Sequence, residues 1–172
     1  MRLISALVFG LLFTLPVKAA DLDVVVKDIT FTSGKDEVKG FVARPKSKGI
    51  YPGLIVIQEW WGLNPWIKEQ ARRLAAKGYV CLAPDLYRGQ VATEMATARK
   101  LMMGMPQDRA ARDLKAATDT LAKMDSVNKD KLGVIGWCMG GGLALQSSIK
   151  DSRLRACVIC YGRVVTEPKQ LA

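Results

Sequence analysis

Histidine is absent from the 172-residue sequence, so no imidazole is available within it to act as a general base. Internal repeats and low-complexity tracts are absent as well, and the length fits a single domain. The net charge is +10, but the basic residues are spread along the chain and no aromatic residues are interleaved with a basic cluster. This pattern indicates ordinary charge on a solvated surface and argues against a nucleic-acid-binding protein.

Long apolar runs are also missing, with one exception at the N-terminus. Residues 1–20 combine an early Arg2, an apolar stretch over residues 3–17, the helix-breaking Pro16 and small residues at the exit. The stretch is too short to span a bilayer comfortably, so a secretory signal is favoured over a membrane anchor. We therefore predict a cleaved signal peptide over residues 1–20 and a mature chain that begins at residue 20 or 21. Export to a bacterial periplasm follows, without stable membrane association.

Three of the four cysteines, Cys81, Cys157 and Cys160, lie in apolar stretches of strand length. In an exported protein, cysteines raise the question of disulfides. Residues three apart on a strand point to opposite faces of the sheet, so Cys157 and Cys160 should not pair. A redox role for this C-x-x-C spacing would need a helix N-terminus to activate the thiol, so structural, reduced cysteines are favoured.

Patterns of strand and helix length alternate along the rest of the chain. β-branched residues at 23–31 and a return segment at 38–43 predict an antiparallel hairpin. Apolar stretches and helical periodicities then predict strands at 54–57, 79–83, 132–136 and 156–161, and helices at 65–77, 94–103, 108–124 and 141–149. This order predicts an α/β fold, a three-layer sandwich with a mostly parallel sheet and an N-terminal antiparallel hairpin. The ligand site of such a sheet lies at the carboxyl ends of its strands.

One stretch, residues 131–142 (KLGVIGWCMGGG), joins a predicted strand to a predicted helix through a turn rich in glycine. Its G-x-C-x-G spacing is typical of a nucleophile elbow, in which a tight turn exposes one reactive side chain. Cys138 would then lie at the N-terminus of the following helix, where the helix dipole favours a thiolate. The alternative is a glycine-rich turn that happens to hold a buried cysteine. A phosphate-binding loop is disfavoured because no Lys-Ser/Thr pair ends the stretch.

Three motifs, at residues 58–64 (QEWWGLN), 83–87 (APDLY) and 136–141 (GWCMGG), closely resemble the dienelactone hydrolase family of α/β-hydrolases in sequence, order and spacing. The resemblance covers essentially the whole mature chain. It implies an α/β-hydrolase-like fold and hydrolysis of a small-molecule ester or lactone through an acyl-enzyme. It implies neither a metal nor an organic cofactor.

The resemblance also implies a role for individual residues. Cys138 matches the nucleophile, and Glu59 matches the glutamate that switches the cysteine between its resting and activated forms. The backbone N–H groups of Trp60 and Met139 match the two oxyanion donors. Asp85, which follows Pro84, is interpreted as a structural turn residue and not as the acid of a catalytic triad.

Two departures from the family pattern matter for function. The triad aspartate and histidine of the family come later than residue 172, so we expect residues 21–172 to form an incomplete, C-terminally truncated α/β-hydrolase domain with weak activity. Arg88 and Arg99 lie in the region where the founding enzymes hold a substrate carboxylate, but neither is in register. The alternative function is a non-catalytic binding protein that keeps the hydrolase pocket. The substrate and the oligomeric state are left open.

Overall fold

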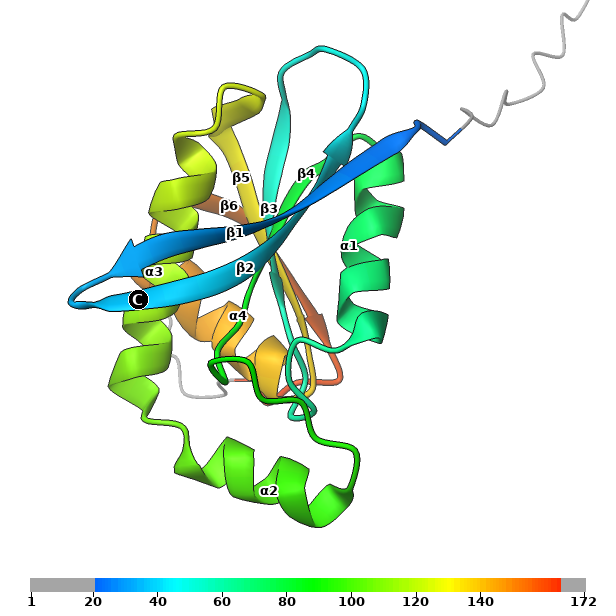
Figure 1. Cartoon of the computed structure of the whole chain (residues 1–172). Coiled ribbons are helices and arrows are strands. Elements are labelled where there is room, and N and C mark those ends of the chain that lie inside the picture. Colours follow the sequence, from blue (N-terminus) through cyan, green and yellow to red (C-terminus); the bar gives the residue numbers. More distant parts are fainter. Residues whose placement is uncertain (1–20, 165–172) are drawn as a thin grey trace, which may run out of the picture.

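The computed structural model describes residues 21–164, which form one six-stranded sheet with four helices around it (Figure 1). The strands are β1 (Val24–Ser33), β2 (Asp36–Pro45), β3 (Tyr51–Ile57), β4 (Val80–Pro84), β5 (Val127–Trp137) and β6 (Leu154–Cys160). The helices are α1 (Pro65–Ala76), α2 (Met95–Gly104), α3 (Gln107–Ala122) and α4 (Met139–Lys150). The strand order across the sheet is β1-β2-β4-β3-β5-β6.

The sheet is mostly parallel, as the alternation of elements predicts. β4, β3, β5 and β6 run parallel to one another, whereas β2 is antiparallel to both β1 and β4. The β1–β2 hairpin turns at Gly34, whose φ of 64° lies in the left-handed region that glycine adopts easily. The predicted α/β-hydrolase-like fold class, including the N-terminal antiparallel hairpin, is confirmed.

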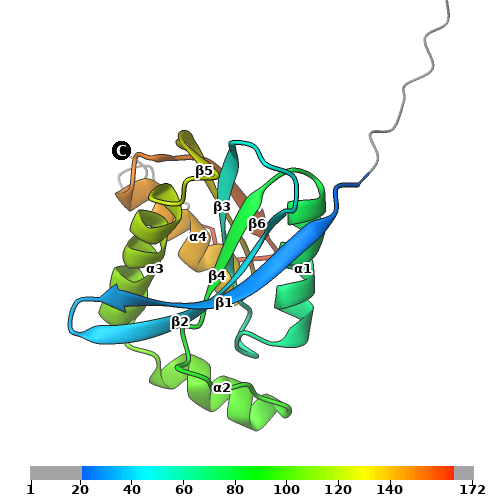
Figure 2. The same cartoon turned by 45° about the horizontal axis from the view of Figure 1, so that its top comes forward.

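Helices cover both faces of the sheet and make it the middle of three layers. α1 lies on one face, and α3 and α4 lie on the other (Figures 1 and 2). Alternate residues of β3 divide between the two cores: Leu54 packs with α1, whereas Ile55 packs with α3 and α4. This two-sided burial explains why β3 reads as a continuous apolar run and not as an alternating strand. α2 lies past the carboxyl ends of the parallel strands, with only Ala98 buried.

Some element boundaries differ from those that the sequence patterns predict. β5 begins at Val127 and not at residue 132, because its first residues pair with the start of β3 before a register shift at Pro52/Gly53. α4 begins at Met139 and not at residue 141, because glycines form its first turn despite their low helix propensity. Tertiary contacts therefore set the first residue of both β5 and α4.

Cys157 and Cys160 confirm the argument from strand geometry. Cys157 packs against the core on the α3–α4 face, and Cys160 packs against the core on the α1 face. All four cysteines, which fall within the described residues, are free. The predicted signal peptide, residues 1–20, lies outside the described part of the chain. Among the helices of residues 21–164, none has the length and apolar character needed to cross a membrane.

Candidate active site

Cys138 is the single residue between the end of β5 and the start of α4. Its φ of 52° and ψ of −117° are unusual for a residue other than glycine. The side chain is half-buried and therefore partly open to solvent. This is the conformation that the predicted strand–turn–helix elbow requires.

Two glycines make the tight turn possible. A Cβ on Gly136 would collide with the backbone carbonyl of Gly140, and a Cβ on Gly140 would collide with the carbonyls of Ile57 and Gln58. The first turn of α4 therefore touches the end of β3 directly. Because Glu59 follows Gln58, this contact brings the elbow and the glutamate to the same edge of the sheet.

The chain after β6 reaches the same edge. The Cys138 backbone N–H donates a hydrogen bond to the Cys160 carbonyl over 2.9 Å, which joins the ends of β5 and β6. Tyr161 follows at once, and its hydroxyl donates to Glu59 Oε1 over 2.7 Å. Tyr161 was not among the predicted site residues. Its position directly after a parallel strand is the signal that could have found it.

The pKa values of two tyrosines at this edge are raised. The hydrogen bond to Glu59 raises the pKa of Tyr161, a largely exposed residue, to about 12, and slight desolvation and the charges of Glu59, Cys138 and Cys160 act in the same direction. Burial raises the pKa of Tyr87 to about 12, and a negative charge on Cys138 adds to this. The Tyr87 hydroxyl also contacts Met139 Sδ at 3.3 Å. Cys138, Glu59 and the two phenols are thus electrostatic neighbours.

The two predicted oxyanion donors flank this group. Met139 is the first residue of α4, so its N–H has no acceptor within the helix. Trp60 follows Glu59 in the turn that leaves β3. Within residues 21–164, neither N–H donates a hydrogen bond to a backbone carbonyl outside the regular elements. No backbone carbonyl of that kind therefore competes for either N–H.

Two pairs of tryptophans lie near the ends of β3 and β5. The rings of Trp60 and Trp61 meet edge to face at a centroid distance of 5.4 Å. Trp137, next to the nucleophile, meets Trp66 of α1 in the same way at 5.4 Å. These four residues are all the tryptophans of the chain, and three of them, Trp60, Trp61 and Trp137, are close in sequence to Glu59 or Cys138.

The structure places the remaining candidates away from this chemistry. Asp85 accepts hydrogen bonds from the backbone N–H groups of Tyr87 and Gly89, which agrees with its interpretation as a turn residue. Arg88 forms an ion pair with the fully buried Asp113 at 2.7 Å and is held in a structural network. Arg99 is exposed on α2. Arg88 is therefore engaged by Asp113, and within residues 21–164 Arg99 has no ion pair.

Neither of the two cavities described below belongs to the edge that carries Cys138. Two cavities in the described residues have volumes of about 620 and 460 Å³, and neither is lined by Cys138 or Glu59. Within residues 21–164, no group of three or more side chains is arranged to hold a metal ion. What the edge offers is a strained cysteine, a carboxylate, two phenols and free backbone N–H groups.

Comparison with known proteins decides the family. The model of the dienelactone hydrolase family matches residues 38–172. This chain belongs to the dienelactone hydrolase family. The resemblance of its three motifs to that family is thereby confirmed.

Individual proteins that this chain resembles are consistent with this result. Protein usf of Aquifex pyrophilus is 40% identical over 141 residues, which make up 78% of this chain and 60% of that protein. A protein of Aquifex aeolicus named "Putative carboxymethylenebutenolidase" is 36% identical over 128 residues, 71% of this chain and 54% of that protein. The solved structure named m3DLH has a TM-score of 0.76 and 34% identity, and the match covers 86% of this chain and 63% of m3DLH. The chain thus spans about half to two thirds of the length of these relatives.

Proposed function

We propose that this chain carries the nucleophile of an exported hydrolase that cleaves a small-molecule ester or lactone through an acyl-enzyme on Cys138. The observation that carries the proposal is the backbone of Cys138, held at φ 52° between β5 and α4 and hydrogen-bonded to Cys160, next to the Tyr161 that donates to Glu59. Membership of the dienelactone hydrolase family supports it, as does the printed name of the Aquifex aeolicus relative.

In the proposed reaction, the Cys138 thiolate attacks the carbonyl carbon of the substrate. The carbonyl π electrons move to its oxygen, which the N–H groups of Trp60 and Met139 stabilise. Such donors are typically worth about 2.7–4 kcal/mol each in acyl-transfer enzymes. The oxyanion then re-forms the carbonyl as the bond to the alkoxide breaks; the alkoxide takes up the proton that left the thiol, and a thioester remains on Cys138. The dipole of α4 favours negative charge on both the sulfur and the oxyanion.

Glu59 is the proposed acceptor of the thiol proton. A carboxylate beside a thiol can take its proton or hold it in an inactive arrangement. Here Tyr161 already donates to Glu59 Oε1, so the hydroxyl competes with the thiol for this oxygen. We propose that breaking this hydrogen bond accompanies activation of Cys138.

Export is proposed from the sequence of residues 1–20 alone. Expression of the whole chain in a bacterial host should yield a periplasmic form whose N-terminus is residue 20 or 21. Replacing Val8 in the apolar stretch by arginine should keep the unprocessed chain in the cytoplasm. A full-length chain in the periplasm would contradict cleavage, and an unprocessed cytoplasmic wild type would contradict export.

The acyl-enzyme step is tested with p-nitrophenyl acetate and intact-mass spectrometry. We expect one acetyl group per chain on Cys138 and little further turnover, since no imidazole exists in the 172 residues to activate the deacylating water. Cys138→Ser should lose the acetylation, whereas Cys157→Ser should keep it. Acetylation that persists in Cys138→Ser would overturn the proposal. Steady hydrolysis that Cys138→Ser abolishes would show that turnover needs no histidine.

The composition also favours a second candidate, a binding protein that keeps the site without the reaction. Its supporting observation is the absence of histidine. Labelling with iodoacetamide near neutral pH separates the two. Selective modification of Cys138 supports a reactive nucleophile, whereas equal inertness of all four cysteines supports the binding protein. Cys81 provides the internal reference, because burial raises the pKa of its thiol well above the ordinary range.

A further inference from the structure

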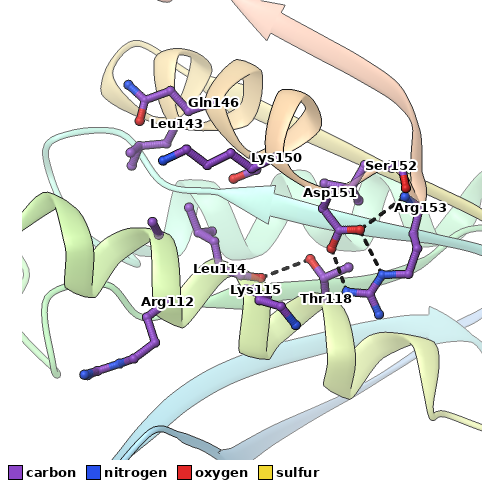
Figure 3. Close-up of a pocket in the computed structure, with 13 residues that line it drawn as sticks. Arg112, Leu114, Lys115, Thr118, Leu143, Gln146, Lys150, Asp151, Ser152 and Arg153 are labelled. Atoms are coloured by element: carbon purple, nitrogen blue, oxygen red, sulfur yellow. Dashed lines mark hydrogen bonds and ion pairs between the residues drawn. The ribbon is translucent and has the colours of Figure 1, made fainter.

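A cavity of about 620 Å³ lies between α3 and α4, away from Cys138 (Figure 3). Its apolar lining comes from Leu114 of α3, Leu143 of α4 and Leu154 at the start of β6. All three side chains belong to the core on this face of the sheet. The volume is in the range of roughly 300–1,000 Å³ that small-molecule sites occupy.

The charged side chains that line the cavity are mainly cationic. Arg112, Lys115, Lys150 and Arg153 line it, against one carboxylate, Asp151. The lining residues thus carry an excess of positive charge beside a leucine surface, although carboxylates pair with three of the four cations. That combination is complementary to an amphipathic anion.

Within residues 21–164, Lys150 is the lining cation that has no carboxylate partner. Arg153 forms ion pairs with Asp119 at 2.7 Å and with Asp151 at 2.6 Å. Lys115 forms an ion pair with Asp119 at 3.0 Å. Arg112 is paired with Asp36. In the described residues, Lys150 has no carboxylate within ion-pairing distance.

The direction of the Lys150 side chain fits this role. Side chains on a helix lean towards its N-terminus, and in Figure 3 Lys150 extends from the last turn of α4 over the cavity. From Leu143 to Lys150 the helix rises about 10 Å at 1.5 Å per residue. An alkyl chain of medium length can lie along this distance.

We propose that this cavity binds an amphipathic carboxylate, an unbranched alkyl chain packed against Leu114 and Leu143 with its carboxylate paired to Lys150. The site is independent of the proposed hydrolase function, because neither Cys138 nor Glu59 lines it. It is nevertheless connected to the elbow, because α4 forms one wall of the cavity and carries the Met139 N–H at its other end.

The test is calorimetric titration of the chain with sodium decanoate below its micellar concentration. Lys150→Met should weaken binding about fivefold, the loss expected for one exposed charge pair. Ser147→Trp, which fills the cavity from α4, should weaken it at least tenfold. Lys100→Met, an exposed lysine on α2, should bind decanoate like the wild type. Cys138→Ser should also bind normally, and decanol should bind more weakly than decanoate.

Several results would overturn the proposal. These are absence of decanoate binding at millimolar concentration, equal affinity for decanol and decanoate, or loss of binding in Cys138→Ser, which would place the ligand at the ester site. Unchanged binding in Lys150→Met would overturn the assigned contact. Lys150 is exposed, so this variant is expected to fold even if Ser147→Trp does not, and circular dichroism checks both.

Discussion

The backbone of Cys138 holds a conformation that typically costs a non-glycine residue about 1–3 kcal/mol. The surrounding structure maintains it through the hydrogen bond from its N–H to Cys160 and through the N–H groups of Gly141 and Gly142, which donate to its carbonyl. The strain projects the side chain out of the sheet edge. The candidate site therefore requires a strained backbone at Cys138, and the packing of the neighbouring elements offsets the cost of this strain.

Tyr161 is expected to restrain the reactivity of Cys138. Tyr161→Phe removes the hydroxyl that donates to Glu59 and leaves Oε1 free to accept the thiol proton. We expect iodoacetamide to label Cys138 about threefold faster in this variant, in line with the loss of one hydrogen bond of about 0.5–1.5 kcal/mol. Tyr51→Phe is the control, since the Tyr51 hydroxyl contacts Ser47 far from the site. A labelling rate equal to that of the control variant would refute the restraint.

Tyr87 should make stability depend on pH in the alkaline range. Burial raises the pKa of Tyr87 to about 12 in the folded chain, whereas the pKa of a tyrosine in an unfolded chain is about 10. Between these values the unfolded chain loses a proton that the folded chain keeps, so the free energy of unfolding falls with rising pH, by at most about 1.4 kcal/mol per pH unit. Below about pH 9 the contribution is constant.

Urea unfolding at pH 9, 10 and 11 tests this expectation. Tyr87→Phe should show a shallower fall in the unfolding free energy than the wild type over this range. Spectrophotometric titration of the tyrosinate band should lose part of its late component in the same variant. Parallel pH profiles for the two proteins would show that Tyr87 keeps its ordinary pKa.

At the scale of elements, α4 is the part on which the site depends. It begins immediately after the nucleophile, it presses its glycine turn against β3, and its length runs beside the cavity at α3. Its packing explains why glycines that weaken an isolated helix are used here. Close approach of the backbones matters more than helix propensity at these positions.

Gly140→Ala should be strongly destabilising. Its Cβ would overlap the carbonyl oxygens of Ile57 and Gln58, which are backbone atoms that cannot easily move. We expect a loss of about 3 kcal/mol in urea unfolding, at the upper end of the usual cost of overpacking.

Gly142→Ala is the matched control in the same helix. The nearest atom to its Cβ would be 3.6 Å away, so the substitution should be neutral or stabilising by up to about 1 kcal/mol. Similar losses in the two variants would show that glycine is needed in α4 for a reason other than the contact with β3.

At the scale of the whole molecule, a buried charge network connects the hairpin to the helices. Asp113 of α3 has no exposed side-chain surface, accepts a 2.6 Å hydrogen bond from Ser33 of β1 and pairs with Arg88 after β4. Arg112 joins Ser33 and Asp36 to the same group. Three segments that are distant in sequence thus share one buried carboxylate.

Arg88→Met should destabilise the whole fold by about 3 kcal/mol, because it leaves the charge of Asp113 buried without its nearest cation. Arg73→Met is the comparison, because Arg73 pairs with Glu69 on the exposed face of α1 and should change the free energy of unfolding by less than about 0.5 kcal/mol. Both are measured by urea unfolding at pH 7. Equal effects would mean that the network adds nothing beyond a surface ion pair.

Much of this architecture could be predicted from local patterns. Two-sided burial produces the uninterrupted apolar run of β3, and the Asn64–Pro65 pair marks the start of α1, where Asn64 Oδ1 accepts from the Ile67 N–H over 3.0 Å. The alternation of side chains along a strand predicted that Cys157 and Cys160 lie on opposite faces of the sheet. The elbow spacing identified Cys138 because few arrangements need glycine on both sides of one reactive residue.

The amino-acid sequence by itself determined the order of the elements, the mixed sheet and the place of the glycine elbow, because propensity and burial periodicity act over a few residues. Only the tertiary structure decided three other features. Tyr161 donates a hydrogen bond to Glu59, Arg88 forms an ion pair with Asp113, and a cavity with mainly cationic charged residues lies between α3 and α4. These features join residues about 25 to 100 positions apart, and no local pattern records which distant side chains the folded sheet brings together.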